Sequence, residues 1–242
     1  MKNTTLILSL GILIVTSCSA QWGKKIKGNG NLVTIKRSVA NYEGVAVSGW
    51  FDVDLVEGRE GNLSLEGEEN LLEYIVTEVK NGSLNIRVKK GANLKPSSWN
   101  QGIRITVPVE DIENISMSGS GDIVGKTTLK ASKFQTAMSG SGDITLHVMA
   151  NTMTATMSGS GDMNLAGKVK DFEASVSGSG DIKAYDLTAD NVQATISGSA
   201  DIKVTAKEML KARVSGSGDI SYRGNPKKVD TKTSGSGDIS KG

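Results

Sequence analysis

Hydrophobic and polar residues alternate one by one in short segments that recur along the second half of the chain. In one such segment Phe134, Thr136 and Met138 have polar residues such as Gln135 between them. Successive side chains of a β-strand point to opposite faces, so this alternation predicts strands that bury one face. The same slots hold Met153, Ala155 and Met157; Phe172, Ala174 and Val176; Val192, Ala194 and Ile196; Leu210, Ala212 and Val214; and Val229, Thr231 and Thr233.

Each of these segments leads into the same turn sequence, and an earlier copy follows Met117. Ser-Gly-Ser-Gly-Asp begins at Ser118, Ser139, Ser158, Ser177, Ser215 and Ser234, and Ser-Gly-Ser-Ala-Asp begins at Ser197. The aspartates lie at positions 122, 143, 162, 181, 201, 219 and 238, so successive copies are 21, 19, 19, 20, 18 and 19 residues apart. An apolar residue follows each aspartate, as at Ile123 and Met163.

A repeat of this length with one turn per copy is typical of a solenoid. At roughly 3.3 Å per residue a 19-residue coil has a perimeter of roughly 60 Å, which suits short sides around a filled interior. The glycines of each copy disfavour helices, because Gly costs about 1 kcal/mol in a helix interior. Antiparallel hairpins are a weaker alternative, since the identical order of every copy favours parallel coils. We predict an all-β, single-stranded parallel β-helix, with regular coils over residues 111–242.

Residues 31–110 lack the turn sequence but still alternate in several segments, such as Phe51 to Val56 and Leu84 to Val88. We predict irregular β coils that cap the apolar interior and form one continuous domain with the repeats. One short helix is expected from Glu68 to Val76, where Leu71, Leu72 and Ile75 share a face. Residues 92–102, with Pro96 and Trp99, are expected to form a loop.

The N-terminus has the pattern of an export signal. Lys2 precedes an apolar run, Leu6 to Val15, which is too short for a membrane-spanning helix of about 20 residues. Val15-Thr16-Ser17-Cys18 resembles a bacterial lipobox, in which the cysteine is acylated, and Cys18 is the only cysteine of the chain. We predict a signal peptide at 1–17 and a lipidated tether at 18–30. Ordinary cleavage after Ala20 is the alternative.

The repeated turn has two interpretations. Glycine, serine and aspartate suit a tight corner, because Gly adopts positive φ and the side chains bond to nearby backbone. Alternatively, carboxylates stacked about 4.8 Å apart repel one another and favour a bound cation such as calcium. The candidate ladder is Asp122, Asp143, Asp162, Asp181, Asp201, Asp219 and Asp238. No other cofactor is expected.

Few residues suit catalysis or nucleic-acid binding. The 28 basic and 26 acidic residues are interspersed, which gives no nucleic-acid footprint. His147 is the only histidine, and its phase in the alternation points it to solvent. Equivalent aspartates offer no reason for two of them to differ in pKa, as acid–base catalysis requires. Among the tryptophans, Trp50 is assigned to the core and Trp22 to the tether, which leaves Trp99 as the candidate ligand contact.

The chain resembles the family described as putative auto-transporter adhesin, head GIN domain. The resemblance rests on the lipobox-like Val15 to Cys18, on Val45 to Val53, on Glu69 to Leu72 and on the repeated Ser-Gly-Ser-Gly-Asp-Ile, and it covers about residues 38–240. It implies a β-helix in an exported protein of a Gram-negative envelope and brings no catalytic or ligand residues. Ala200 departs from the pattern, which indicates that the second glycine of the turn does not need positive φ.

These observations favour a membrane-anchored, non-catalytic module for adhesion or recognition, with an extracellular or envelope glycan or protein as partner. The expected location is the outer membrane, as a lipoprotein on the periplasmic face or the cell surface. A self-associating structural protein is the alternative, because the last copy, Ser234 to Ile239, lacks a polar cap and invites a homo-oligomer. A polysaccharide-active enzyme is a minor alternative.

Overall fold

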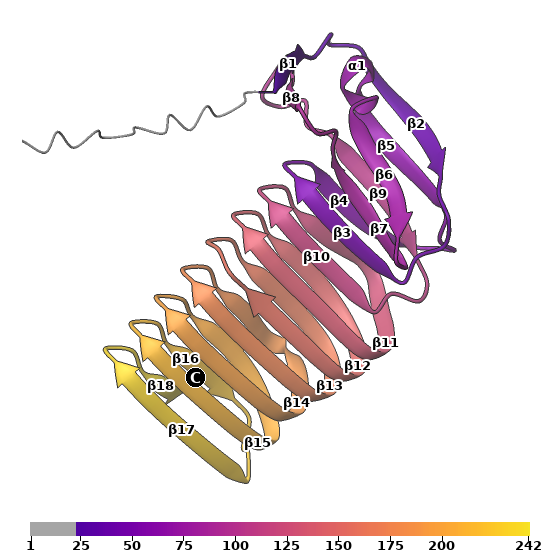
Figure 1. Cartoon of the computed structure of the whole chain (residues 1–242). Coiled ribbons are helices and arrows are strands. Elements are labelled where there is room, and N and C mark those ends of the chain that lie inside the picture. Colours follow the sequence, from indigo (N-terminus) through magenta and orange to yellow (C-terminus); the bar gives the residue numbers. More distant parts are fainter. Residues whose placement is uncertain (1–22) are drawn as a thin grey trace, which may run out of the picture.

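The second half of the protein is a straight rod of stacked parallel coils (Figure 1). The computed structural model describes residues 23–242, so the signal peptide, Cys18 and Trp22 lie outside the described residues. The rod consists of β10 (Asn114–Gly119), β11 (Ile123–Gly140), β12 (Ile144–Met157), β13 (Met163–Gly178), β14 (Ile182–Gly198), β15 (Ile202–Gly216), β16 (Ile220–Arg223), β17 (Lys228–Gly235) and β18 (Ile239–Lys241). No helix of residues 23–242 is long and apolar enough to cross a bilayer.

Equivalent residues of successive coils pair in register, which confirms the predicted β-solenoid. Phe134 of β11 lies opposite Met153 of β12, which in turn lies opposite Phe172 of β13. From β11 to β15 the inward positions are buried as the alternation predicted, for example Phe134 at 1% and Met138 at 3% exposure. In the four coils after that of β11 an alanine occupies the position of Thr136, between the two large side chains. Side chains of the same size therefore stack on one another from coil to coil. The same slots of β17, Val229, Thr231 and Thr233, are exposed instead, because β17 pairs with a neighbour on one side only.

The first half contributes two further coils, and their order in space differs from their order in the chain. β3 (Gly44–Gly49) and β4 (Asp52–Glu57) pair in parallel with the first regular coil, β10 and β11. On their other side they pair with β7 (Ser83–Val88) and β9 (Arg104–Val109). The earlier segment therefore lies inside the stack, and the later one lies further from the rod.

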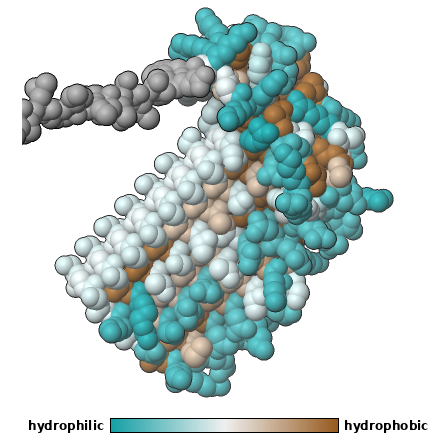
Figure 2. Space-filling view, viewed as in Figure 1, coloured by the Kyte–Doolittle hydropathy of each residue, from teal (hydrophilic) through white to brown (hydrophobic). Residues whose placement is uncertain are grey.

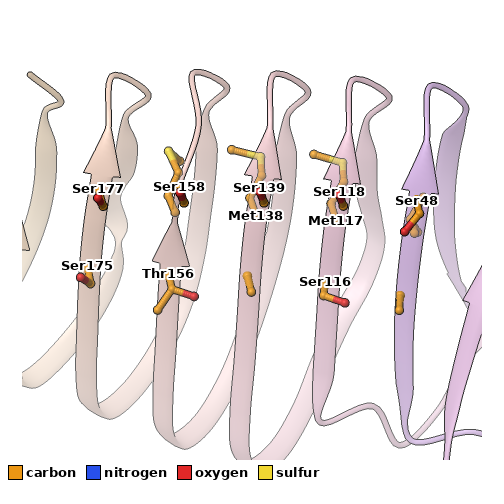
Figure 3. Close-up of a pocket in the computed structure, with 14 residues that line it drawn as sticks. Ser48, Ser116, Met117, Ser118, Met138, Ser139, Thr156, Ser158, Ser175 and Ser177 are labelled. Carbon is orange, nitrogen blue, oxygen red and sulfur yellow. The ribbon is translucent and has the colours of Figure 1, made fainter. Parts of the chain in front are cut away.

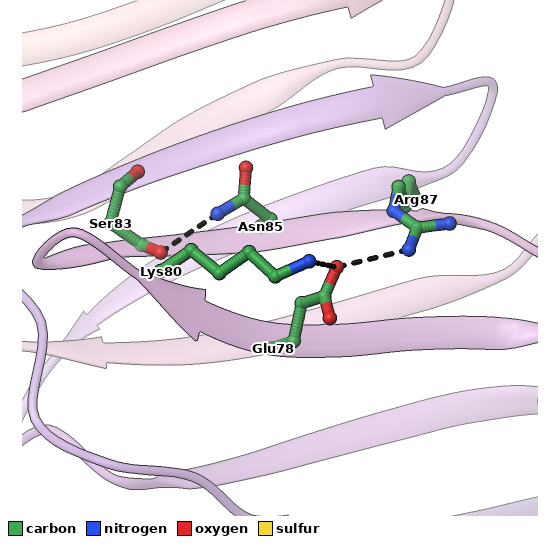
Figure 4. A network of polar contacts seen from close by, with 5 residues as sticks. All are labelled: Glu78, Lys80, Ser83, Asn85 and Arg87. Atoms are coloured by element: carbon green, nitrogen blue, oxygen red, sulfur yellow. Dashed lines mark hydrogen bonds and ion pairs between the residues drawn. The ribbon is translucent and has the colours of Figure 1, made fainter.

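Antiparallel strands close this end of the stack, and they form the cap. β2 (Leu32–Ser38) pairs with β5 (Asn62–Glu68), β5 also pairs with β9, and β6 (Ile75–Lys80) pairs with β7. On β6, Glu78 accepts hydrogen bonds from Lys80 and Arg87, both at 2.9 Å (Figure 4). These bonds from Lys80 and Arg87 lower the pKa of Glu78. The predicted irregular coils thus include antiparallel pairing that the alternation did not reveal.

Three local expectations need correction. The helix α1 spans only Glu69–Leu72, because Ile75 begins strand β6 instead of continuing the helix. The partly buried guanidinium of Arg37 donates to the carbonyl of Leu72 at 2.6 Å and to that of Ile75, which holds the end of the helix in place. Within the expected loop, Ala92–Lys95 form β8, and its partner is β1 (Lys24–Lys27), which was expected to be tether.

Candidate functional site

The aspartates of the repeated turns form a hydrogen-bonded ladder. The backbone N–H of each aspartate donates to Oδ1 of the aspartate one coil earlier, for example from Asp143 to Asp122 and from Asp162 to Asp143, both at 2.9 Å. The same bond recurs at 3.3, 2.9, 3.0 and 2.8 Å up to Asp238. Each carboxylate therefore uses one oxygen to satisfy the backbone of the next turn.

Cation binding by this ladder remains a prediction. Within residues 23–242 no group of three or more His, Cys, Asp or Glu side chains is arranged to hold a metal ion. Lys183 supplies a positive charge to the column, since its Nζ lies 2.5 Å from Oδ2 of Asp162. The hydrogen bond to Asp162 raises the pKa of Lys183.

An eighth ladder member escaped the sequence analysis. Oδ1 of Asp52 accepts the N–H of Asp122, and Val45 to Gly49 pair in register with Ile115 to Gly119. The segment Ser48-Gly49-Trp50-Phe51-Asp52 is therefore a degenerate copy of the turn. The sequence did indicate this copy, because Ser48, Gly49, Asp52 and the apolar Val53 keep the spacing of the repeated turn. Trp50 is partly buried against the core, beside the buried Phe51.

From β3 to β14, the first serine of each turn and the outward residue two positions earlier form a long uncharged surface, the serine face, whereas Arg213 and Lys232 hold the outward position in the last two coils. A shallow groove of about 500 Å³ lies on it, bordered by Ser48, Ser118, Ser139, Ser158 and Ser177 and by the edges of Met117, Met138 and Met157. Figure 3 shows the hydroxyls in rows across neighbouring coils. In Figure 2 a pale band of such residues runs along the rod, with apolar side chains beside it.

The predicted ligand contact, Trp99, lies on the loop after β8 and is 97% exposed. It lines a pocket of about 410 Å³ together with Leu32, Glu66, Arg104 and Asp52. Arg104 is held in place by Asp54, whose Oδ2 lies 3.1 Å from Nη1 of Arg104. An exposed indole beside charged groups can stack on an apolar surface while its neighbours make polar contacts.

A buried carboxylate organises the region around this loop. Glu68 is 1% exposed and accepts the N–H of Gly30 at 2.6 Å and that of Ser97 at 2.9 Å. Burial opposes ionisation of Glu68, but the hydrogen bonds from Ser97 and Gly30 outweigh it and lower the pKa. One side chain thus ties the chain before β2 to the loop that carries Trp99.

The histidine lies where the alternation placed it. His147 is exposed on β12, and its Nδ1 lies 3.0 Å from Oγ1 of Thr128. No carboxylate contacts it among the hydrogen bonds and ion pairs of the described residues, and the ladder aspartates lie at the turns. The structure therefore does not bring His147 and the aspartates into one site.

These features define a parallel β-solenoid with a closed cap and an uncharged serine face from β3 to β14. The chain belongs to the family described as putative auto-transporter adhesin, head GIN domain, whose model matches residues 41–226. This finding confirms the resemblance drawn from the repeats. No curated protein matches the chain.

Solved structures share the fold along most of the chain. A putative adhesin from Bacteroides fragilis has a TM-score of 0.84 at 23% identity and covers 89% of this chain and 99% of its own. A protein described as a putative lipid binding protein from Parabacteroides distasonis has a TM-score of 0.76 at 27% identity, with coverages of 90% and 100%. A putative adhesin from Parabacteroides merdae has a TM-score of 0.70 at 20% identity, with coverages of 90% and 99%.

Proposed function

We propose that this protein is an exported, lipid-anchored and non-catalytic recognition module of the cell envelope. Export and acylation at Cys18 would place it in the outer membrane, on the periplasmic face or the cell surface. The rod would then present the serine face to an extended glycan or protein. The description of the family as adhesins supports this role.

The observation that carries the proposal is the regularity of the serine face. Its groove spans neighbouring coils and is lined by Ser, Thr, Ala, Val and Met, without a charged side chain. Coils lie about 4.8 Å apart, so hydroxyls recur at that spacing along the rod. An extended partner with its own regular spacing can make the same contact several times, which raises its overall affinity.

The absence of catalysis in this proposal rests on the equivalence of the aspartates. From Asp122 to Asp219 each one accepts the same backbone bond from the next turn, and among these Asp162 alone also has an ion pair, with Lys183, so no two of them are arranged as an acid and a base. The coils also have nearly uniform length, which leaves few insertions to build a substrate groove. Hydrolysis of a glycan that is abolished by a single Asp→Asn change would contradict this view.

The direct test is a glycan and matrix-protein array probed with residues 21–242, with calcium and with chelator. We expect specific binding that Ser139→Arg weakens at least tenfold, because the arginine would project from the serine face. Thr145→Arg adds the same charge after the turn, away from the groove, and serves as the matched control. Equal loss in both variants, or no binding in either condition, would remove the support for recognition through this face.

Self-association is a second candidate function, favoured by the last long strand. Every residue of β17 is exposed, and the strand pairs only with β15. An unpaired strand edge is a template for another chain. Antiparallel pairing of two β17 strands centred on Thr231 would place Asp230 opposite Lys232 of the second copy, which is a favourable cross-strand pair.

Light scattering at increasing concentration tests this pairing. Lys232→Asp would place like charges opposite each other and abolish the dimer, whereas adding Asp230→Lys would restore complementary charges and the dimer. A protein that stays monomeric at every concentration, or a dimer that ignores both changes, would exclude pairing through β17.

A further inference from the structure

The edge of the cap where the described chain begins carries six exposed lysines, which we call the basic edge. They are Lys24, Lys25, Lys27, Lys89, Lys90 and Lys95. β1 and β8 bring two of them directly opposite each other, since Lys27 pairs with Lys95. The ion pairs found within residues 23–242 include none of the six.

The acidic side chains near the basic edge form no ion pair with its lysines within residues 23–242. Glu68 is buried and occupied by two backbone N–H groups, and Glu69 accepts a hydrogen bond from Asn31 at 2.9 Å. Glu66 lines the Trp99 pocket. Like charges directly opposite on paired strands are destabilising. The cap therefore keeps a cluster of repelling cations that an anionic partner outside the chain would relieve.

Exposed apolar side chains lie next to these cations. Leu32 is 52% exposed and lines the same pocket as Trp99. Glu68 brings their segments together, because it holds Gly30, two residues before Leu32, and Ser97, two residues before Trp99. The N–H of Gly28 donates to the carbonyl of Lys95 at 2.8 Å, which joins the basic edge to this apolar pair.

Lysines beside an exposed tryptophan suit the surface of a lipid bilayer. Anionic lipids attract basic segments close to the membrane, and tryptophan favours the boundary between headgroups and acyl chains. The position in the chain is also suitable, because five peptide steps separate Cys18 from Gly23. Covalent geometry limits that span to about 18 Å. An acyl chain at Cys18 would therefore hold this end of the molecule near the bilayer.

We infer that the basic edge, Leu32 and Trp99 form a docking face for an anionic bilayer. The face orients the cap against the membrane and leaves the rod free to project from it. This inference deepens the proposed function, since the placement of the face relies on the proposed anchor at Cys18. It assigns Trp99 to contact with lipid and not with a glycan.

The test uses the chain from position 18 carrying Cys18→Ser, so that no acyl chain is attached. We expect it to cosediment with phosphatidylethanolamine vesicles containing about one third phosphatidylglycerol, and salt to weaken the binding. Replacing Lys24, Lys25 and Lys27 by Gln should weaken partition about 100-fold. Trp99→Ala should weaken it about tenfold. Lys130, Lys133 and Lys168, which are exposed on the rod, provide the matched triple replacement and should have little effect.

Several outcomes would overturn the inference. One is a failure of the protein to bind anionic vesicles while its circular dichroism shows that it is folded. Another is an equal loss of vesicle binding in the control variant that replaces Lys130, Lys133 and Lys168. A third is capture by a soluble acidic polysaccharide, with the same lysine dependence and without vesicle binding, which would assign the face to a glycan. Array binding and fatty-acid labelling of Cys18 are measured separately, so failure of the proposed function would be distinguished from failure of this face.

Discussion

Small side chains at the turns let neighbouring coils approach closely. A Cβ added to Gly142 would lie 1.8 Å from the carbonyl oxygen of Gly121, and one added to Gly161 would meet Gly142 in the same way. These second glycines are absent from the positive-φ positions, whereas the first glycines Gly119 and Gly216 have φ of 146° and 136°. A Cβ added to Gly119 would likewise lie 1.8 Å from the carbonyl oxygen of Gly49, so close approach applies to both glycines, and positive φ is an additional requirement at first glycines such as Gly119 and Gly216. Ala200 is consistent with the prediction that the second glycine does not need positive φ.

Thr136 offers a residue-scale prediction for the core. It occupies the slot that alanine holds in the next four coils, and its buried Oγ1 lacks a hydrogen-bond partner among the described residues. An unsatisfied buried hydroxyl costs about 1–3 kcal/mol. We expect Thr136→Val, which keeps the shape, to raise the free energy of unfolding in urea by about 1 kcal/mol or more. A loss of stability would mean that the hydroxyl is bonded in solution.

Glu68 provides the pH dependence of the cap. Its pKa is lowered in the folded state, so its stabilising contribution is complete above its ordinary value of 4.5 and is lost as pH falls through the lower folded pKa. We expect hydrogen exchange at the amides of Gly30 and Ser97 to be slow at neutral pH and faster in acid, after correction for intrinsic rates. Glu68→Gln should remove this acid step, and an unchanged step would assign it to another carboxylate.

At the scale of elements, the turn is the unit that joins one coil to the next. Each Ser-Gly-Ser-Gly-Asp turn contributes backbone bonds, such as Ile123 N–H to the carbonyl of Asp143, and one carboxylate bond to the following coil. The helix α1 and strand β6 illustrate the opposite case. There the local pattern predicts a longer helix, but pairing of Ile75–Lys80 with β7 ends it after four residues.

The ladder can be separated from a cation column by two substitutions at one turn. Oδ1 of Asp143 accepts the N–H of Asp162, and Asn retains this acceptor while Ala removes it. We expect Asp143→Ala to lower the free energy of unfolding by about 0.5–1.5 kcal/mol and Asp143→Asn to change it little. The melting temperatures of the wild-type protein and of both variants, measured with calcium and with chelator, complete the test. Stabilisation by calcium that Asp143→Asn abolishes would favour the cation interpretation instead.

At the scale of the whole molecule, stability is distributed along the rod. Each regular coil before the last pairs with its two neighbours, and the interior is one continuous apolar column from the cap to Ile220. In such a repeat protein the free energy of unfolding is approximately a sum over coils and their interfaces. The cap shields one end of this column, whereas β17 leaves Val229 47% exposed at the other end.

Removal of one complete coil tests this picture. Deleting residues 163–181 joins Asp162 to Ile182, which occupies the position of Met163 in the register, and removes 19 residues. We expect a shorter rod with the same circular dichroism spectrum and a lower urea midpoint. Deleting residues 163–171 removes only nine residues, so the next Ser-Gly-Ser-Gly-Asp turn arrives nine residues too early to stack on its neighbours, and that protein should not fold. Similar behaviour of both deletions would contradict the coil as the structural unit.

The regular rod could be predicted from residues alone, and parts of the cap could not. The alternation around Phe134, Thr136 and Met138 predicts their burial, and the seven copies of the turn predict a parallel stack. Asp52 was missed because Trp50 and Phe51 replace the serine and glycine of its turn. The pairing of β1 with β8 was missed because each strand has only four residues, Lys-Lys-Ile-Lys and Ala-Asn-Leu-Lys, which is too short for an apolar alternation to stand out. The clustering of six lysines at the basic edge follows from that pairing.

The sequence by itself determined the repeating half of this protein, because each coil makes the same contacts with its neighbour and the pattern records them seven times. It also determined the chemistry of the turns, where glycine lets neighbouring coils approach closely and aspartate accepts a backbone N–H of the next coil. Only the tertiary structure decided how the first half is arranged. There β3 lies between β10 and β7, β4 lies between β11 and β9, and a buried glutamate joins segments 38 and 29 residues away from it. Such contacts are made once, between distant residues, so no local periodicity reports them.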